Sequence, residues 1–352
     1  MSCRECRELI SLRAAAAGLA VLSAGCARPQ GTLFSPINPP RVWPSPPETP
    51  RIRLVGVLAS SSDLKAARTF SNAMDTALRG PRPPIRFSSP QGVAVSASNL
   101  VAVADGDGGA VHIIDLDQRT HQTVFGDGDE RFGVPMGVAW AGERLFVTDA
   151  KRREVIGLDP QGRWRTRFGA EWLVRPVGVT FIPVRQELIV VDGGAHRIAV
   201  FDLSGQLVRL VGGRGTEPGQ FNFPTHISCF GERLLVSDSG NARVQLLDPY
   251  GQCIQTFGKK GDAAGDLSFP KGVAWDRDGH IYVVDAHFEN VQIFAETGEL
   301  LLAFGEEGVG LGELSLPAGL TIDEQDRIWV ADSGNHRLQV FAYARPPLRE
   351  NG

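Results

Sequence analysis

The stretch that decides the fold is residues 317–341, which read PAGLTIDEQDRIWVADSGNHRLQVF. It opens with a proline, passes through an apolar run that ends at Asp332, turns at small polar residues and continues as an alternating strand. Five earlier segments repeat this order. The six units begin at Pro90, Pro135, Pro176, Pro224, Pro270 and Pro317, with spacings of 45, 41, 48, 46 and 47 residues. A period of this length is typical of repeat architectures such as propellers.

The first five units each carry the signals for four short strands joined by tight turns, and the sixth carries the signals for three. The second strand ends in an aspartate in every unit, and these are Asp105, Asp149, Asp192, Asp238, Asp285 and Asp332. A lone four-stranded sheet of this size cannot bury both faces, whereas a ring of such sheets can. The sequence therefore predicts an all-β protein, a six-bladed β-propeller with four-stranded antiparallel blades.

The two ends of the repeat region predict how the ring closes. The sixth unit stops near Tyr343 without a fourth strand, and RIRLVG at 51–56 is similar to LVRLVG at 207–212. We therefore expect residues 51–57 to complete the last blade, so that no open sheet edge remains. The propeller would then span residues 51–344, followed by a short tail at 345–352.

Two segments resemble the consensus of the NHL repeat. They are residues 330–341, VADSGNHRLQVF, and the partial copy from Asn241 to Val244. The resemblance extends over about residues 51–343. It implies a propeller with a central channel and partners bound at the face that bears the loops between blades.

The N-terminus is similar to an export signal. Arg4, Arg7 and Arg13 precede an apolar stretch at 14–24, which is too short to cross a bilayer as a helix. The run LSAGC at 22–26 resembles a bacterial lipobox, although Leu22 lies one place further from the cysteine than usual. We expect residues 1–25 to be a lipoprotein signal peptide and Cys26 to carry the lipid; the alternative is a plain signal peptide with an incidental cysteine.

The next residues predict a tether. Residues 26–50 are rich in proline, which favours an extended stalk. Ala27 stands where an aspartate would favour inner-membrane retention, so the expected location is the cell envelope, with the outer membrane preferred. The net charge of −4 gives no reason to expect nucleic acid. We expect a monomeric propeller without a cofactor, in which Cys229 and Cys253 are small core residues rather than a disulfide.

Candidate binding residues lie on the face that carries the loops joining fourth strands to first strands and the turns joining second strands to third strands; we call it the top face. Positions just after each proline differ between units, while the framework around them repeats. His226 replaces a glycine found in the other five units. The predicted binding residues are Gln91, Met136, Arg175, Thr225, His226, Lys271, Arg152 and His287, while Val177 and Ala318, at two of the variable positions, can simply pack. The repeated aspartates are interpreted as caps of their own turns.

The least repetitive segment lies between Gly56 and Pro90. It holds 33 residues, and Asp63 to Arg79 has apolar residues at a helical period. We predict a helical insertion over residues 60–80, which either packs on the propeller or docks a partner.

Two functions remain open from the sequence. The first is a membrane-tethered interaction module that binds a protein, peptide or glycan on the top face. The second is a metal-dependent propeller enzyme, a lyase or lactonase with its site at the channel mouth. His226 is placed near where propeller lyases resembling peptidyl-amidoglycolate lyase hold zinc, but such a site needs three ligands and no other unit has a histidine there.

Overall fold

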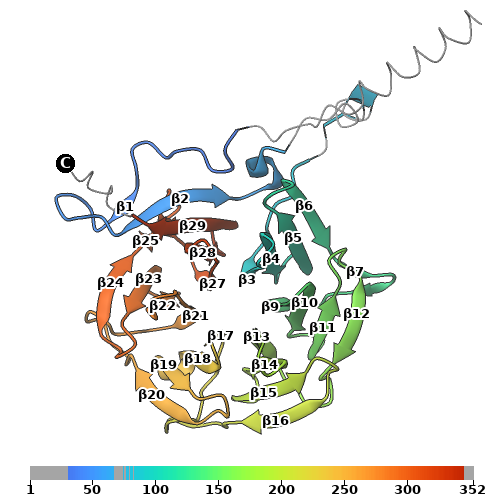
Figure 1. Cartoon of the computed structure of the whole chain (residues 1–352), viewed down its shortest axis with the longest axis vertical. Helices are drawn as coiled ribbons and strands as arrows, with labels where there is room; N and C mark the ends of the chain where they lie inside the picture. The colour runs from blue at the N-terminus through green and yellow to red at the C-terminus, as the bar shows by residue number, and fades with distance from the viewer. Residues whose placement is uncertain (1–30, 67–73, 75–76, 79, 82, 345–352) are drawn as a thin grey trace, which may run out of the picture. The chain divides into compact units, whose positions relative to one another are not determined.

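Four-stranded sheets are arranged as six blades around a channel, as Figure 1 shows. The computed structural model describes residues 31–66, 74, 77–78, 80–81 and 83–344. The chain divides into two units, one of residues 1–32 and 65–83 and one of residues 33–64 and 84–352. The second unit is the propeller, and it confirms the predicted fold class.

The blades follow one another along the chain, and each strand is antiparallel to its neighbours. Blade one holds β3 (Pro90–Val95), β4 (Leu100–Asp105), β5 (Ala110–Asp115) and β6 (Thr120–Val124); blade two holds β9 (Pro135–Ala141), β10 (Arg144–Asp149), β11 (Glu154–Leu158) and β12 (Trp164–Phe168); blade three holds β13 (Pro176–Ile182), β14 (Glu187–Asp192), β15 (Arg197–Asp202) and β16 (Leu207–Val211). Blade four holds β17 (Ile227–Phe230), β18 (Arg233–Asp238), β19 (Arg243–Leu247) and β20 (Cys253–Phe257); blade five holds β21 (Pro270–Trp275), β22 (Ile281–Asp285), β23 (Asn290–Phe294) and β24 (Leu300–Phe304).

Blade six combines strands from both ends of the propeller. It holds β27 (Pro317–Ile322), β28 (Arg327–Asp332), β29 (Arg337–Tyr343) and, as its outer strand, β2 (Ile52–Leu58). In Figure 1 the blue β2 lies beside the red β29, and the register pairs Ile52 with Tyr343 and Leu58 with Leu338. The predicted ring closure is therefore confirmed. The short β1 (Val42–Trp43) extends this sheet by a fifth strand, because Trp43 pairs with Ile52 and packs on Phe304 and Phe341.

Minor elements lie in the connections between blades. A hairpin of β7 (Gly126–Asp127) and β8 (Glu130–Arg131) separates blades one and two, and a parallel pair of β25 (Glu306–Glu307) and β26 (Glu313–Leu314) precedes blade six. The 3-10 turns are η1 (Ser61–Leu64) and η2 (Ser239–Asn241). Of the predicted insertion at 60–80, Met74, Ala77 and Leu78 are helical, and most of the remainder lies outside the described residues.

The core lies between blades rather than within them. In the described part of the chain the buried apolar side chains form six clusters, and each cluster joins the facing sides of two adjacent blades. Phe146, Phe201, Phe294 and Trp329 are fully buried in such clusters. Because each sheet buries both faces against its neighbours, the stability of every blade depends on the blades beside it.

A ring of glycines lets the inner strands approach each other. A β-carbon on Gly92 would lie 2.5 Å from the carbonyl oxygen of Met136, and one on Gly137 would lie 2.3 Å from that of Val177. Gly178, Gly272 and Gly319 make the same kind of approach to the next blade. His226 occupies this place in blade four, so its β-carbon cannot repeat the contact. The inner strand of that blade begins at Ile227, three residues after Pro224, whereas the inner strands of the other five blades begin at their prolines.

Candidate functional site: the channel mouth

A cavity of about 380 Å³ opens on the top face at the start of the inner strands. Five blades contribute to it. Its lining consists of Gln91, Met136, Arg175, Val177, Gly193, Phe223, Pro224, Thr225, His226, Gly240, Phe269 and Lys271. Blade six contributes nothing to this lining, since its equivalent side chain, Ala318, is fully buried. The cavity is therefore off-centre, on the side of the channel where blades three to five meet.

Six of the eight predicted binding residues line this cavity. They are Gln91, Met136, Arg175, Thr225, His226 and Lys271. Arg152 lies elsewhere: it pairs with Glu154 and with Glu130 at 2.7 Å, and it covers the Trp164 ring at 5.4 Å. His287 is exposed on the turn after β22 and is also outside the lining. The variable positions after the prolines thus converge in space, whereas the candidates on the turns between second and third strands do not.

The apolar wall of the cavity includes residues that sequence reasoning missed. Phe223 and Phe269 each stand directly before the proline of their blade, and they are 50% and 43% exposed. Phe223 has a φ of 46°, which is unusual for a bulky residue. Its backbone N–H donates to Nδ1 of His196 at 3.1 Å, and the two rings lie 4.3 Å apart. The residue before each proline varies as strongly as the residue after it, and that signal would have found both phenylalanines.

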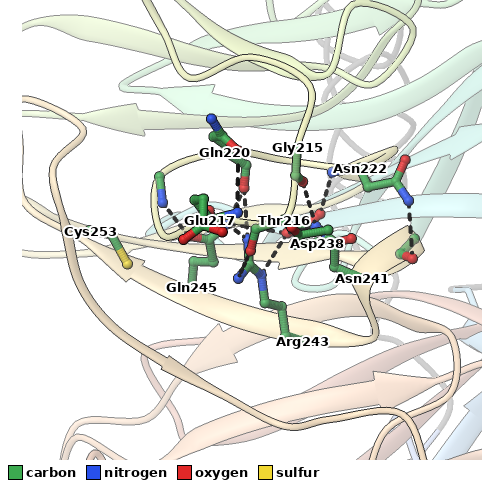
Figure 2. Close-up of polar contacts among 12 residues, drawn as sticks. Gly215, Thr216, Glu217, Gln220, Asn222, Asp238, Asn241, Arg243, Gln245 and Cys253 are labelled. Atoms are coloured by element: carbon green, nitrogen blue, oxygen red, sulfur yellow. Dashed lines mark hydrogen bonds and ion pairs between the residues drawn. The ribbon is translucent and has the colours of Figure 1, made fainter.

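The loop that carries Phe223 is held by a buried network centred on Asp238 (Figure 2). Asp238 accepts hydrogen bonds from the Asn222 backbone at 2.6 Å, from Nδ2 of Asn241 at 2.8 Å and from Nε of Arg243 at 2.8 Å. Arg243 also donates to the carbonyl oxygens of Thr216, Glu217 and Gln220, and Gln245 donates to the last of these at 2.7 Å. These residues bind the incoming loop as well as the turn that follows β18.

Blade six repeats this arrangement with the same residue types. Asp332 accepts from Ser315 N at 2.7 Å and from Nε of Arg337 at 2.7 Å, while Arg337 donates to the carbonyl oxygens of Val309, Gly310 and Glu313. Asp149 likewise accepts from the amides of Gly133 and Val134 in the incoming loop and from those of Lys151 and Arg152 in its own turn. The repeated aspartates therefore fix the position of the loops that form the cavity rim.

The charged side chains that line the cavity are all positive. Arg175 and Lys271 are positive, and the lining contains no carboxylate. Burial, followed by the nearby charge of Lys271, lowers the pKa of His226 to about 3, so its imidazole is neutral near pH 7. Burial also lowers the pKa of Lys271. In the described ranges no group of three His, Cys, Asp or Glu side chains is arranged to hold a metal ion.

The two remaining cysteines are Cys229 and Cys253, and both are free and partly buried. Burial raises the pKa of each thiol, and the Cys229 thiol contacts Oγ1 of Thr180 at 3.4 Å. Neither cysteine lines the channel-mouth cavity. Within the described residues no helix is long and apolar enough to cross a membrane.

Comparison with known proteins identifies the type of repeat in the last unit. Residues 314–341 match the NHL repeat. This segment contains Asp332 and Arg337, the two side chains that bind the incoming loop of blade six. The chain is also 29% identical over 133 residues to the protein brain tumor of Drosophila melanogaster; the match covers 36% of this chain and 13% of that protein.

Solved structures share the propeller. An auxiliary nutrient binding protein from Bacteroides thetaiotaomicron superposes with a TM-score of 0.58 at 13% identity, over 74% of this chain and 70% of that one. Virginiamycin B lyase from Staphylococcus aureus, solved with quinupristin, superposes with a TM-score of 0.55 at 14% identity, over 74% of this chain and 85% of that one. At these identities the similarity concerns the fold alone.

Proposed function

We propose that the protein is an interaction module that binds its ligand in the channel-mouth cavity of the top face. The observation that carries this proposal is the convergence of the variable positions: side chains from five blades meet in one cavity of about 380 Å³. Its lining is mainly apolar with a few polar groups, which is the usual composition of a ligand site. The NHL repeat supports it as well, because propellers of this kind commonly mediate protein interactions.

The test is ligand capture by a chain whose cavity is filled. Met136 is half-buried in the lining, and Met136→Trp would occupy part of the volume. We expect this variant to lose a partner that the unaltered chain retains from an extract of its own cells. Val184→Trp is the matched control, because Val184 is 74% exposed on a turn of the opposite face. Equal capture by both variants would place the binding surface elsewhere.

We further infer that the module is tethered to a membrane through Cys26. The support is the sequence LSAGC at 22–26 together with the proline-rich residues that follow it. In a bacterial host, labelled fatty acid should be incorporated into the chain, and Cys26→Ser should remove both the label and the membrane association. Cys3→Ser is the control, because Cys3 lies within the expected leader. Label that survives Cys26→Ser would contradict the anchor.

A further inference from the structure

The channel-mouth cavity has two cations without a partner. Lys271 is half-buried and Arg175 is exposed at the edge. Among the described residues neither side chain has a hydrogen bond or an ion pair, and Lys271 has only the ring of Phe269 at 5.9 Å. By contrast, Arg209 and Arg243 are both bound to carboxylates. Withdrawing the charge of Lys271 from water without a counter-ion is unfavourable, so an anion in the cavity would relieve that cost.

His226 lies beside these cations without adding a charge to the lining. Its imidazole is neutral near pH 7, and a hydrogen bond with the Gln91 backbone favours a proton on the ring. Its Nδ1 atom is buried without a hydrogen-bond partner. In a neutral imidazole that donates from one nitrogen, the other nitrogen is an acceptor. Because this atom is buried, a ligand in the cavity does not reach it, and the neutral imidazole offers no counter-charge to a ligand.

The remaining lining is apolar. Met136, Val177, Phe223 and Phe269 form most of the wall, and the two phenylalanines are roughly half exposed. Exposed aromatic side chains at a concave site offer a large contact area for an apolar ligand group. The cavity therefore offers a place for a negative charge and a surface for an apolar side chain, and it has no carboxylate to pair with a free ammonium group.

We propose that the cavity binds an N-acylated amino acid with an apolar side chain through its free carboxylate. Lys271 and Arg175 would pair with the carboxylate, and Phe223 and Phe269 would contact the side chain. Acylation would remove the charge of the amino group, for which the lining has no carboxylate. Two sources share this chemistry: the C-terminal residue of a polypeptide and a small acylated amino acid. This assignment rests on the proposed function, since it takes the cavity to be the ligand site.

The experiment measures binding by calorimetry to the full chain carrying Cys26→Ser. The probes are N-acetyl-phenylalanine and its uncharged amide, N-acetyl-phenylalaninamide. We expect the acid to bind at least about tenfold tighter than the amide, because a charge-assisted contact is lost in the amide. Lys271→Met should remove this preference. Lys260→Met is the matched control, since Lys260 is exposed on the top face outside the cavity.

A second pair of probes separates the two sources. An octapeptide ending in phenylalanine, with a free or an amidated C-terminus, should bind much tighter than the acetylated amino acid if the natural ligand is a chain end. Equal affinity of the free octapeptide and the acetylated amino acid would indicate a small molecule. Either result supports the proposed carboxylate site.

Three results would overturn it: no binding of either acid, equal affinity for acid and amide, or an unchanged preference in a Lys271→Met chain that unfolds like the unaltered one. These outcomes differ from a failure of the proposed function. If Met136→Trp abolishes capture of a partner while acid and amide bind alike, the cavity is the ligand site and the carboxylate assignment is wrong.

Discussion

At the scale of single residues, the buried aspartates connect the repeat in the sequence to the loops of the top face. Asp238 is fully buried, and its carboxylate is the partner of the Arg243 guanidinium. In five blades this carboxylate joins a turn to the loop that enters the same blade, whereas Asp192 accepts from the incoming loop and pairs with Arg197. The sequence indicated their role in their own turns, but the bonds to the incoming loop depend on tertiary contacts that no local pattern contains.

Replacing Asp238 tests this role. We expect Asp238→Ala to lower the free energy of unfolding by about 3 kcal/mol or more, because the Arg243 charge would remain without its partner. Denaturant titration measures the loss. Asp262→Ala is the control, since Asp262 is exposed on the loop that follows blade four, and it should change stability by less than about 0.5 kcal/mol. Equal losses in the two variants would contradict the network.

The histidines predict a dependence of stability on pH. Burial and the neighbouring His112 lower the pKa of His121 to about 4, and His226 has a pKa of about 3. Both values lie below the 6.5 of an unfolded histidine. Above pH 6.5 these two imidazoles are neutral in the folded and in the unfolded chain. Below pH 6.5 they take up protons in the unfolded chain, whereas in the folded chain they stay neutral until about pH 4. Stability should therefore fall as the pH drops from 6.5 toward 4.

The slope has an upper limit of about 1.4 kcal/mol per pH unit for each histidine. Urea titrations between pH 7 and pH 4.5 measure it. His226→Gln should reduce the slope, whereas Val184→Gln, at an exposed position without a titratable group, should leave it unchanged. If His226→Gln has the slope of the unaltered chain, His226 titrates normally in the folded state.

At the scale of elements, β2 is the strand that completes blade six and closes the ring. It covers the outer edge of β29, and its residues Ile52, Leu54 and Leu58 are buried in the clusters on both sides of blade six. The sequence predicted this strand because its pattern is similar to the fourth strand of blade three. The addition of β1 could not be predicted, since Val42 and Trp43 lie in a proline-rich segment that does not suggest a strand.

Truncation tests the closing strand. A chain that begins at residue 33 keeps the whole propeller unit, whereas one that begins at residue 60 lacks β1 and β2. We expect the first to unfold in one cooperative step. The second should aggregate or lose cooperativity, because β29 would present an unpaired edge and two clusters would open. Size-exclusion chromatography and thermal melts distinguish them, and a stable monomer that begins at residue 60 would show that closure is dispensable.

At the scale of the whole molecule, the inner strands pack through their glycines. Gly137→Ala would bring a β-carbon within 2.3 Å of the Val177 carbonyl oxygen, so two blades must move apart. We expect a loss of about 2 kcal/mol or more in the free energy of unfolding. Gly213→Ala is the control, since a β-carbon there meets nothing within 4 Å, and it should change stability by less than about 1 kcal/mol. Similar melting temperatures for the two variants would disprove the tight approach.

The candidate site was partly predictable because the units repeat. Repetition made the variable positions visible, and six of the eight selected residues meet in one cavity. Arg152 lies outside this cavity, and its pairing with Glu130 and Glu154 could not be predicted because these partners come from different strands. The sequence shows that blade four lacks the inner-strand glycine, because His226 takes its place. It does not predict that the inner strand of this blade begins at Ile227 or that the cavity lies off-centre.

The pairing of β2 with β29 also determines how the molecule would respond to force. Ile52 lies opposite Tyr343, so the chain enters and leaves blade six at the same end of this antiparallel pair. Tension between the residues that precede β2 and the C-terminus would load the hydrogen bonds between β2 and β29 one pair at a time rather than all together in shear. Pulling in that direction should open the ring at blade six first, at low force, while a load applied within a single blade leaves the seam closed.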